Sequence, residues 1–194
     1  MIARYLVLTT LFFTLPAFAG TEFPVQFEPH PDAPAGVKQF GQFAGDWVCS
    51  LESKQQDGSW QTRPGRAAWN WYYVNDGFAV QDIWNPYYES STEQKSGPRV
   101  GTNLRIYNPE TDSWQAIWAT GASTKVEIYD AEMAGKDMIM RRDASDDATR
   151  GPHLAKITFY NITRSKFDWR YEAAPLNNPE SFTEQVRLQC ERQK

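Results

Sequence analysis

The sequence predicts an all-β protein in which about ten antiparallel strands close into an up-and-down barrel behind an extended N-terminal arm. Three observations lead to this fold class. Short runs of aromatic and β-branched residues follow one another from Trp47 onward, separated by residues that favour turns. No segment shows a sustained helical period. Two cysteines, Cys49 and Cys190, fall in the first and last of these runs.

Residues 1–19 have the features of a secretory signal peptide. A basic residue, Arg4, precedes an apolar run from Tyr5 to Pro16, and Ala17-Phe18-Ala19 places small residues at both ends of a cleavage triplet. The apolar run is shorter than the ~20 residues that a membrane span needs. We therefore expect cleavage after Ala19, a secreted or periplasmic protein, and no membrane span.

Residues 20–43 form the predicted arm. The stretch 20–36 is rich in proline and has no hydrophobic period, and Val37 to Phe43 could form one helical turn. We expect His30, which lies between two prolines, to be a linker residue. The barrel domain is expected to occupy residues 44–194.

The barrel strands are expected where apolar and polar residues alternate, as in half-buried antiparallel strands. Asn75-Asp76-Gly77 is a tight hairpin signal. The connection 85–97 is longer and polar, as in a loop at the mouth of a barrel. The expected strands are 45–54, 60–74, 77–84, 98–107, 113–119, 124–132, 136–142, 153–162, 166–173 and 181–191.

Ten short strands fit a sandwich or a closed barrel, and the cysteines favour the barrel. In an oxidising compartment two cysteines suggest one disulfide, although two buried free thiols are the alternative. Cys49 and Cys190 both lie in apolar stripes of their strands. A disulfide between them requires neighbouring first and last strands, which closes the sheet on itself and removes both edges.

Charge and motifs exclude several classes of function. The net charge of −4 argues against a nucleic-acid-binding protein, which needs a basic stripe. The sequence has no Gly-x-Ser-x-Gly elbow, phosphate-binding loop or dinucleotide fingerprint. His, Cys and carboxylate residues do not occur together at metal-ligand spacing, so we expect no metal site.

Aromatic residues are the strongest candidates for ligand binding. Indole and phenol groups provide large contact areas and carry a polar atom that can orient a small molecule. The alternative is that each of them only fills the barrel core. The candidates are Trp69, Trp71, Tyr73, Trp84, Trp114, Trp118, Trp169 and Tyr171.

Two carboxylates within apolar stripes, together with Arg141 or Arg142, one of which must face inward in a regular strand, suggest a catalytic alternative. Asp82 lies between Val80 and Trp84, and Glu184 lies between Phe182 and Val186. A buried carboxylate needs an arginine partner or a polar ligand, and it can serve as an acid or base. In the competing interpretation they lie at the barrel mouth or face outward through a bulge.

Gly45-Asp-Trp47 resembles the Gly-x-Trp signature of lipocalins and other calycins. The wider pattern resembles lipocalin-like proteins of the domain-of-unknown-function 1579 type, through the segments 40–47, 101–118 and 162–175. This resemblance implies a calycin barrel with an internal cavity and a tryptophan packed across its closed end. Ten strands also resemble the fatty-acid-binding and nitrobindin branches.

Nitrobindin-like relatives bind haem through a histidine, and this chain departs from that pattern. Its two histidines are His30 and His153, and neither lies near the chain end, so we expect no haem and no other cofactor. Three functions follow as hypotheses. The first is binding of a small hydrophobic or aromatic molecule, and the second is an isomerase, lyase or hydrolase on the same barrel. The third is an interaction module that uses 20–36 and 85–97, with an unknown protein partner.

Overall fold

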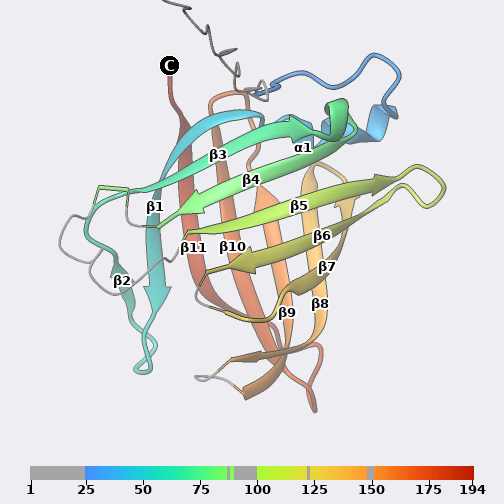
Figure 1. Cartoon of the computed structure of the whole chain (residues 1–194). Coiled ribbons are helices and arrows are strands. Elements are labelled where there is room, and N and C mark those ends of the chain that lie inside the picture. Colours follow the sequence, from blue (N-terminus) through green and yellow to red (C-terminus); the bar gives the residue numbers. More distant parts are fainter. Residues whose placement is uncertain (1–24, 87, 90–99, 122, 148–150) are drawn as a thin grey trace, which may run out of the picture.

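A computed structural model describes residues 25–86, 88–89, 100–121, 123–147 and 151–194. Its strands form one antiparallel sheet that closes on itself (Figure 1). The expected signal peptide and most of the connection 85–97 lie outside the described residues. Within the described part of the chain, no helix has both the length and the apolar character required to cross a membrane.

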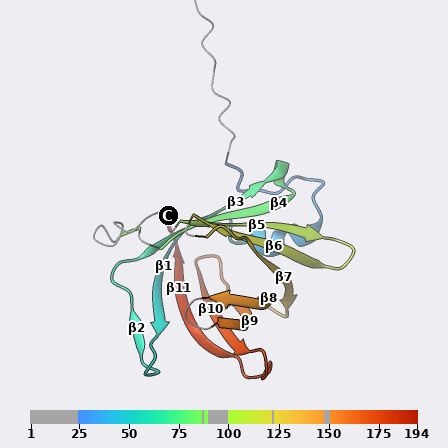
Figure 2. The ribbon, with the colours of Figure 1, turned by 60° about the horizontal axis from the view of Figure 1, so that its bottom comes forward.

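Neighbouring strands in the sheet are neighbours in the sequence, apart from the first three. The order is β11-β10-β9-β8-β7-β6-β5-β4-β3-β1-β2, and an additional pairing of β11 with β1 closes the circuit. Figure 2 shows β3 to β6 across one side of the barrel and β8 to β11 facing them. The strands are β1 (Gly45–Lys54), β2 (Trp60–Thr62), β3 (Ala67–Val74), β4 (Ala79–Asn85), β5 (Gly101–Asn108), β6 (Ser113–Thr120), β7 (Glu127–Ala134), β8 (Asp137–Asp147), β9 (Gly151–Tyr160), β10 (Lys166–Pro175) and β11 (Thr183–Arg192).

The expected strand 60–74 is two strands. Pro64 lacks a backbone N–H and Gly65 has a φ of 76°, so a continuous ladder cannot run through this point. The first piece, β2, pairs only with the far end of β1. The other ten strands make the closed circuit, as the sequence predicted.

A disulfide joins the first and last strands of the circuit. Cys49 lies directly opposite Cys190 in the antiparallel β1–β11 pair, and their sulfur atoms are bonded. The described residues contain no free cysteine. The predicted disulfide and the closure that it implied are therefore both confirmed.

A short helical segment plugs one end of the barrel. It consists of η1 (Ala35–Val37) and α1 (Lys38–Gly41), at the position where the sequence suggested a helical turn. Val37, Phe40 and Phe43 are buried. The Phe40 ring contacts residues of both walls, with ring centroids 5.0 Å from Trp114 and 5.8 Å from Phe159.

Trp47 and Arg192 seal the same end. The Trp47 Nε1–H donates to the Phe43 carbonyl at 2.7 Å. The Arg192 guanidinium lies 4.2 Å from the Trp47 ring and donates to the carbonyls of Gln42 and Ala44. The Gly-x-Trp tryptophan therefore packs across the closed end, as the resemblance implied.

The described part of the arm packs against the β3–β4 hairpin. Gln26 forms a bridge with Tyr73, and the His30 ring stacks on Phe78 at 5.0 Å. The hairpin itself turns through Asn75, Asp76 and Gly77 in the left-handed region. A side chain at Gly77 would collide with the backbone of His30, so glycine is required there for two reasons.

Candidate functional site

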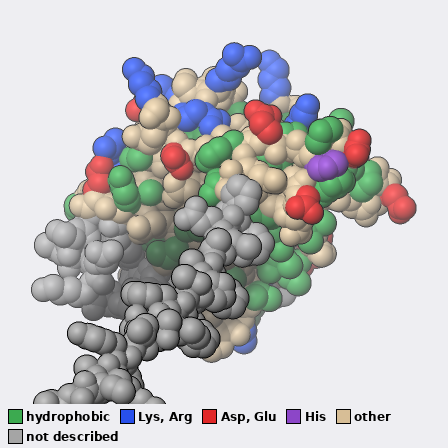
Figure 3. Space-filling model, turned by 45° about the horizontal axis from the view of Figure 1, so that its top comes forward, with side chains coloured by type: hydrophobic (Ala, Val, Ile, Leu, Met, Phe, Trp, Pro, Cys, Tyr) green, Lys and Arg blue, Asp and Glu red, His purple; other side chains and the backbone are tan. Residues whose placement is uncertain are grey.

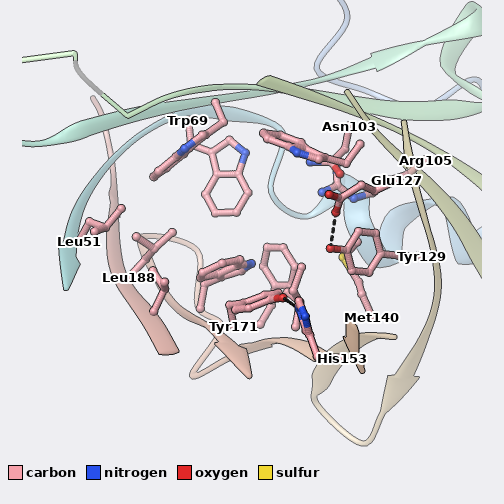
Figure 4. Close-up of a pocket in the computed structure, with 16 residues that line it drawn as sticks. Leu51, Trp69, Asn103, Arg105, Glu127, Tyr129, Met140, His153, Tyr171 and Leu188 are labelled. Carbon is pink, nitrogen blue, oxygen red and sulfur yellow. Dashed lines mark hydrogen bonds between the residues drawn. The ribbon is translucent and has the colours of Figure 1, made fainter. Parts of the chain in front are cut away.

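The barrel interior contains a cavity of about 350 Å³ (Figure 4). This volume falls in the range of about 300–1,000 Å³ that is typical of small-molecule pockets. Inward-facing residues of most strands line it. They are Leu51, Trp69, Trp84, Asn103, Arg105, Trp118, Glu127, Tyr129, Met140, His153, Ile157, Phe159, Trp169, Tyr171, Val186 and Leu188.

Five of the eight aromatic candidates line this cavity. Trp69 and Trp84 lie opposite each other on β3 and β4, with ring centroids 5.0 Å apart. Trp169 meets the Trp69 ring edge-on at 6.2 Å. Trp118 and Tyr171 complete the set. The structure thus brings five aromatic residues from four strands together around one space.

The other three candidates lie deeper, next to the plug. Trp71 stacks on Phe40 at 6.2 Å, and the Trp114 Nε1–H donates to Gln39 Oε1 at 2.8 Å. Tyr73 packs so closely on Gly41 that no side chain would fit there. Period-2 alternation correctly places all three on the inner face, but it carries no information about depth along the barrel axis.

The inward face of β5 is the polar one. The sequence grouped Val100, Ile106 and their neighbours on one face and Asn103 and Arg105 on the other, without showing which faces inward. In the structure Val100 and Ile106 are 45% and 48% exposed, whereas Arg105 is 1% exposed. A hydrophobic pattern alone would have turned this strand the wrong way.

A buried ion pair explains this inversion. Asp82 of β4 and Arg105 of β5 bond directly, and both are excluded from solvent. The Asn103 side-chain amide donates to both Asp82 oxygens at 3.1 and 3.2 Å. Desolvation lowers the pKa of Arg105, and the Asp82 carboxylate opposes this by favouring the charged guanidinium. The guanidinium also lies 4.3 Å from the Trp71 ring.

Neither carboxylate of the catalytic alternative, Asp82 or Glu184, lines the cavity. Asp82 is held by Arg105 and Asn103 and is not among the residues that line the cavity. Glu184 lies opposite Glu172 in the β10–β11 pair, beyond a register shift. Glu172 pairs with Lys156, and neither Glu172 nor Glu184 lines the cavity, although one carboxylate oxygen of Glu184 is buried without a hydrogen-bond partner among the described residues.

Two polar pairs line the wall opposite Trp69. Glu127 accepts a hydrogen bond from the Tyr129 hydroxyl at 2.9 Å and pairs with Arg142 at 2.6 Å. Burial, with the Glu127 charge adding to it, raises the pKa of Tyr129. Arg141 instead pairs with Glu132 on the outside, so Arg142 is the inward arginine of β8.

His153 and Tyr171 form the second polar pair. The His153 Nδ1 lies 2.7 Å from the Gly151 carbonyl, which can only accept, so Nδ1 carries a proton. In the neutral ring, Nε2 then accepts from the Tyr171 hydroxyl at 2.6 Å. Both nitrogens of the histidine considered for haem are thus engaged by protein groups. No cluster of three or more metal-ligating side chains exists among the described residues.

Sequence reasoning missed the polar part of the lining. Glu127, Tyr129 and His153 sit near strand ends, where alternation is hard to follow through the adjoining turns. The usable signal was in β5, where Asn103 and Arg105 alternate with apolar residues just as Asp82 does in β4. In the β4–β5 pair Asp82 lies opposite Asn103 and Arg105 lies opposite Val80, so opposite charges two positions apart on one face form the interior pair.

The outer surface shows no uninterrupted basic stripe on the face seen in Figure 3. Basic side chains gather along one margin with acidic ones beside them, among apolar and uncharged polar groups. Nothing in this arrangement indicates a nucleic-acid-binding surface.

Comparison with known proteins supports the fold. No family model matches the chain, and no curated protein matches its sequence. Among solved structures, the S-type phycobiliprotein lyase CPES from Guillardia theta is similar with a TM-score of 0.52 and 10% identity. That match covers 81% of this chain and 92% of the lyase. Rv2717c from M. tuberculosis is similar with a TM-score of 0.53 and 9% identity, over 84% of this chain and all of that chain. At these identities the comparison shows the fold alone, which is a closed antiparallel barrel of the lipocalin-like kind.

Proposed function

We propose that this protein binds a small hydrophobic or aromatic molecule inside its barrel. The observation that carries the proposal is a cavity of about 350 Å³ in a closed barrel, with an indole or phenol from each of several strands on its wall. Aromatic walls offer a ligand large apolar contact areas, and rigid aromatic side chains lose little conformational entropy when the ligand binds. The similarity to a phycobiliprotein lyase is compatible with a barrel that holds a ligand.

We further propose that the protein is exported and belongs to the domain-of-unknown-function 1579 type. Export is supported by the Cys49–Cys190 disulfide, since such bonds persist in oxidising compartments. The family assignment rests on the segments 40–47, 101–118 and 162–175, which supply the end of the plug with the start of β1, most of the β5–β6 hairpin, and β10.

Binding accounts for the site better than catalysis does. Asp82 is held by two protein partners, and Glu184 lies beyond a register shift and does not line the cavity. The remaining cavity carboxylate, Glu127, is paired with Arg142. A general acid or base needs a proton that it can exchange with a substrate, whereas Asp82 and Glu127 are both engaged by protein groups and Glu184 lies outside the cavity lining.

The first test is native mass spectrometry of protein purified from its own host. We expect a bound small molecule that is released when the protein unfolds. A titration with 1-aminoanthracene should then quench tryptophan fluorescence with saturation at one molecule per chain.

Filling the cavity provides the specificity control. Val186→Trp places an indole in the space that Val186 lines and should abolish 1-aminoanthracene binding. Ile128→Trp adds the same group on the outside, where Ile128 is exposed, and should leave binding unchanged. Equal binding by the two variants would refute the proposal.

A further inference from the structure

Three buried N–H donors at the inner end of the cavity have no acceptor among the described residues. They are Trp69 Nε1, Trp71 Nε1 and Arg105 Nε. Buried donors are nearly always hydrogen-bonded in native proteins, because an unpaired one loses its bonds to water without replacement. Such a cluster of donors therefore requires an explanation.

The residues that carry the three donors lie next to one another. The Arg105 guanidinium lies 4.3 Å from the Trp71 ring, and the rings of Trp69 and Trp71 are 5.1 Å apart. Trp69 and Arg105 line the cavity, and Trp71 lies beneath them against the plug. Figure 4 shows Trp69 and Arg105 on the side of the cavity that faces Tyr171.

The charges near this cluster are already compensated. Arg105 pairs with Asp82, and Glu127 on the neighbouring wall pairs with Arg142. An anionic ligand group would be buried here beside an arginine that already has a carboxylate partner. A cationic group would be buried beside a carboxylate that already has an arginine partner. A neutral acceptor meets the donors without this cost.

We propose that the inner end of the cavity recognises a neutral carbonyl-type oxygen on an apolar or aromatic ligand, through the N–H groups of Trp69 and Arg105. This inference rests on the proposed function and specifies the ligand's chemical class. The oxygen points toward the plug, and the apolar body contacts Trp84, Trp118 and Trp169.

Three naphthalenes of equal size test the proposal. They are 2-acetylnaphthalene, which carries a ketone, 2-isopropylnaphthalene, which carries a hydrocarbon branch, and 2-naphthoate, which carries a charge. Calorimetry or fluorescence titration should give the ketone an affinity about tenfold above the hydrocarbon, as expected for one well-placed hydrogen bond. The carboxylate should bind at least about tenfold more weakly than the ketone. Equal binding of ketone and hydrocarbon, or tightest binding of the carboxylate, would overturn the inference.

Trp69→Phe removes one donor and keeps an aromatic ring. It should reduce the ratio of the ketone's affinity to the hydrocarbon's affinity severalfold, whatever its effect on the contact area that both ligands share. Trp84→Phe is the matched control, because Trp84 lines the same cavity next to Trp69 and its nitrogen is not among the buried unpaired donors. The ketone's advantage should survive in this control. If it survives equally in Trp69→Phe, the proposed recognition is wrong.

An infrared measurement on the unaltered protein provides a readout that does not depend on a variant. The carbonyl stretch of bound 2-acetylnaphthalene should lie below its frequency in hexane, as in a hydrogen-bonded ketone. A hexane-like frequency in the complex would refute the inference. If none of the three naphthalenes binds, the proposed function itself fails. If they bind without discrimination, only the carbonyl recognition fails.

Discussion

Arg192 illustrates how one side chain can complete a fold. Its guanidinium covers the Trp47 ring and donates to the carbonyls of Gln42, Ala44 and Arg164. It thereby ties the last strand to the plug and to the β9–β10 connection at once. A partly buried cation that satisfies several carbonyls contributes more than an exposed ion pair does.

Arg192→Met should lower the free energy of unfolding by about 2–4 kcal/mol, because these carbonyls lose a charged donor and the indole loses its cation. Urea denaturation followed by tryptophan fluorescence would measure it. The control is Arg141→Met, which breaks an exposed pair with Glu132 and should change stability very little. Similar losses in both variants would contradict this role of Arg192.

The Asp82–Arg105 pair makes a second prediction at the residue scale. Asp82→Ala leaves a buried guanidinium without its partner and should cost about 3–5 kcal/mol in urea denaturation. The double variant Asp82→Leu, Arg105→Met removes both charges and should cost less than the single one. Additive losses in the double variant would show that the two groups are not energetically coupled.

At the scale of elements, the barrel depends on the pairing of β1 with β11. Their disulfide links residues 141 positions apart, and the same two strands carry the Gly-x-Trp seal and Arg192. Closure is thus fixed covalently at one register position and by hydrogen bonds along the rest of the pair.

The double variant Cys49→Ala, Cys190→Ala should lower stability by about 4–5 kcal/mol, since the open chain gains the entropy of a long loop when it unfolds. Urea denaturation measures the difference. The unaltered protein in a reducing buffer should lose the same amount. Unchanged stability in either case would mean that the strand pairing alone determines closure.

The element pattern was largely predictable, and its exceptions have physical causes. Ten strands, their turns and their closure follow from alternation, from turn residues such as Asn75 and Gly77, and from the two cysteines. The break at Pro64 and Gly65 was visible in the sequence, but the aromatic residues further away on both sides, Trp60 and Trp69, were assigned to one strand. The cavity lining was predicted only in its aromatic part. Asn103 and Arg105 were missed because burial of polar groups depends on partners in other strands, which a single strand's pattern does not show.

At the scale of the whole molecule, buried tyrosines on both walls link stability to alkaline pH. Burial, with the charge of Glu28 adding to it, raises the pKa of Tyr73 from 10 to about 12. The folded protein then holds this proton more tightly than the unfolded chain does. Stability is therefore fully present below pH 10 and falls as the pH rises toward 12.

Thermal unfolding measured between pH 8 and 12 should show a melting temperature that declines above pH 10. Tyr73→Phe should make that decline shallower, because the variant has no phenol to ionise at this position. Tyr72→Phe provides a comparison at a less buried neighbour and should alter the decline less. A melting temperature that is independent of pH up to 12 would contradict the assignment.

The position of the plug has a consequence for attaching the protein to a surface or to a reporter. The helical segment that precedes β1 and the residues that follow Arg192 meet there, where the Gln193 amide donates to the Asp46 carbonyl. The described C-terminal residues therefore lie beside the plug. A sensor surface or a fused reporter attached through Lys194 would hold the molecule by its plugged end and leave the rest of the barrel facing the surrounding medium.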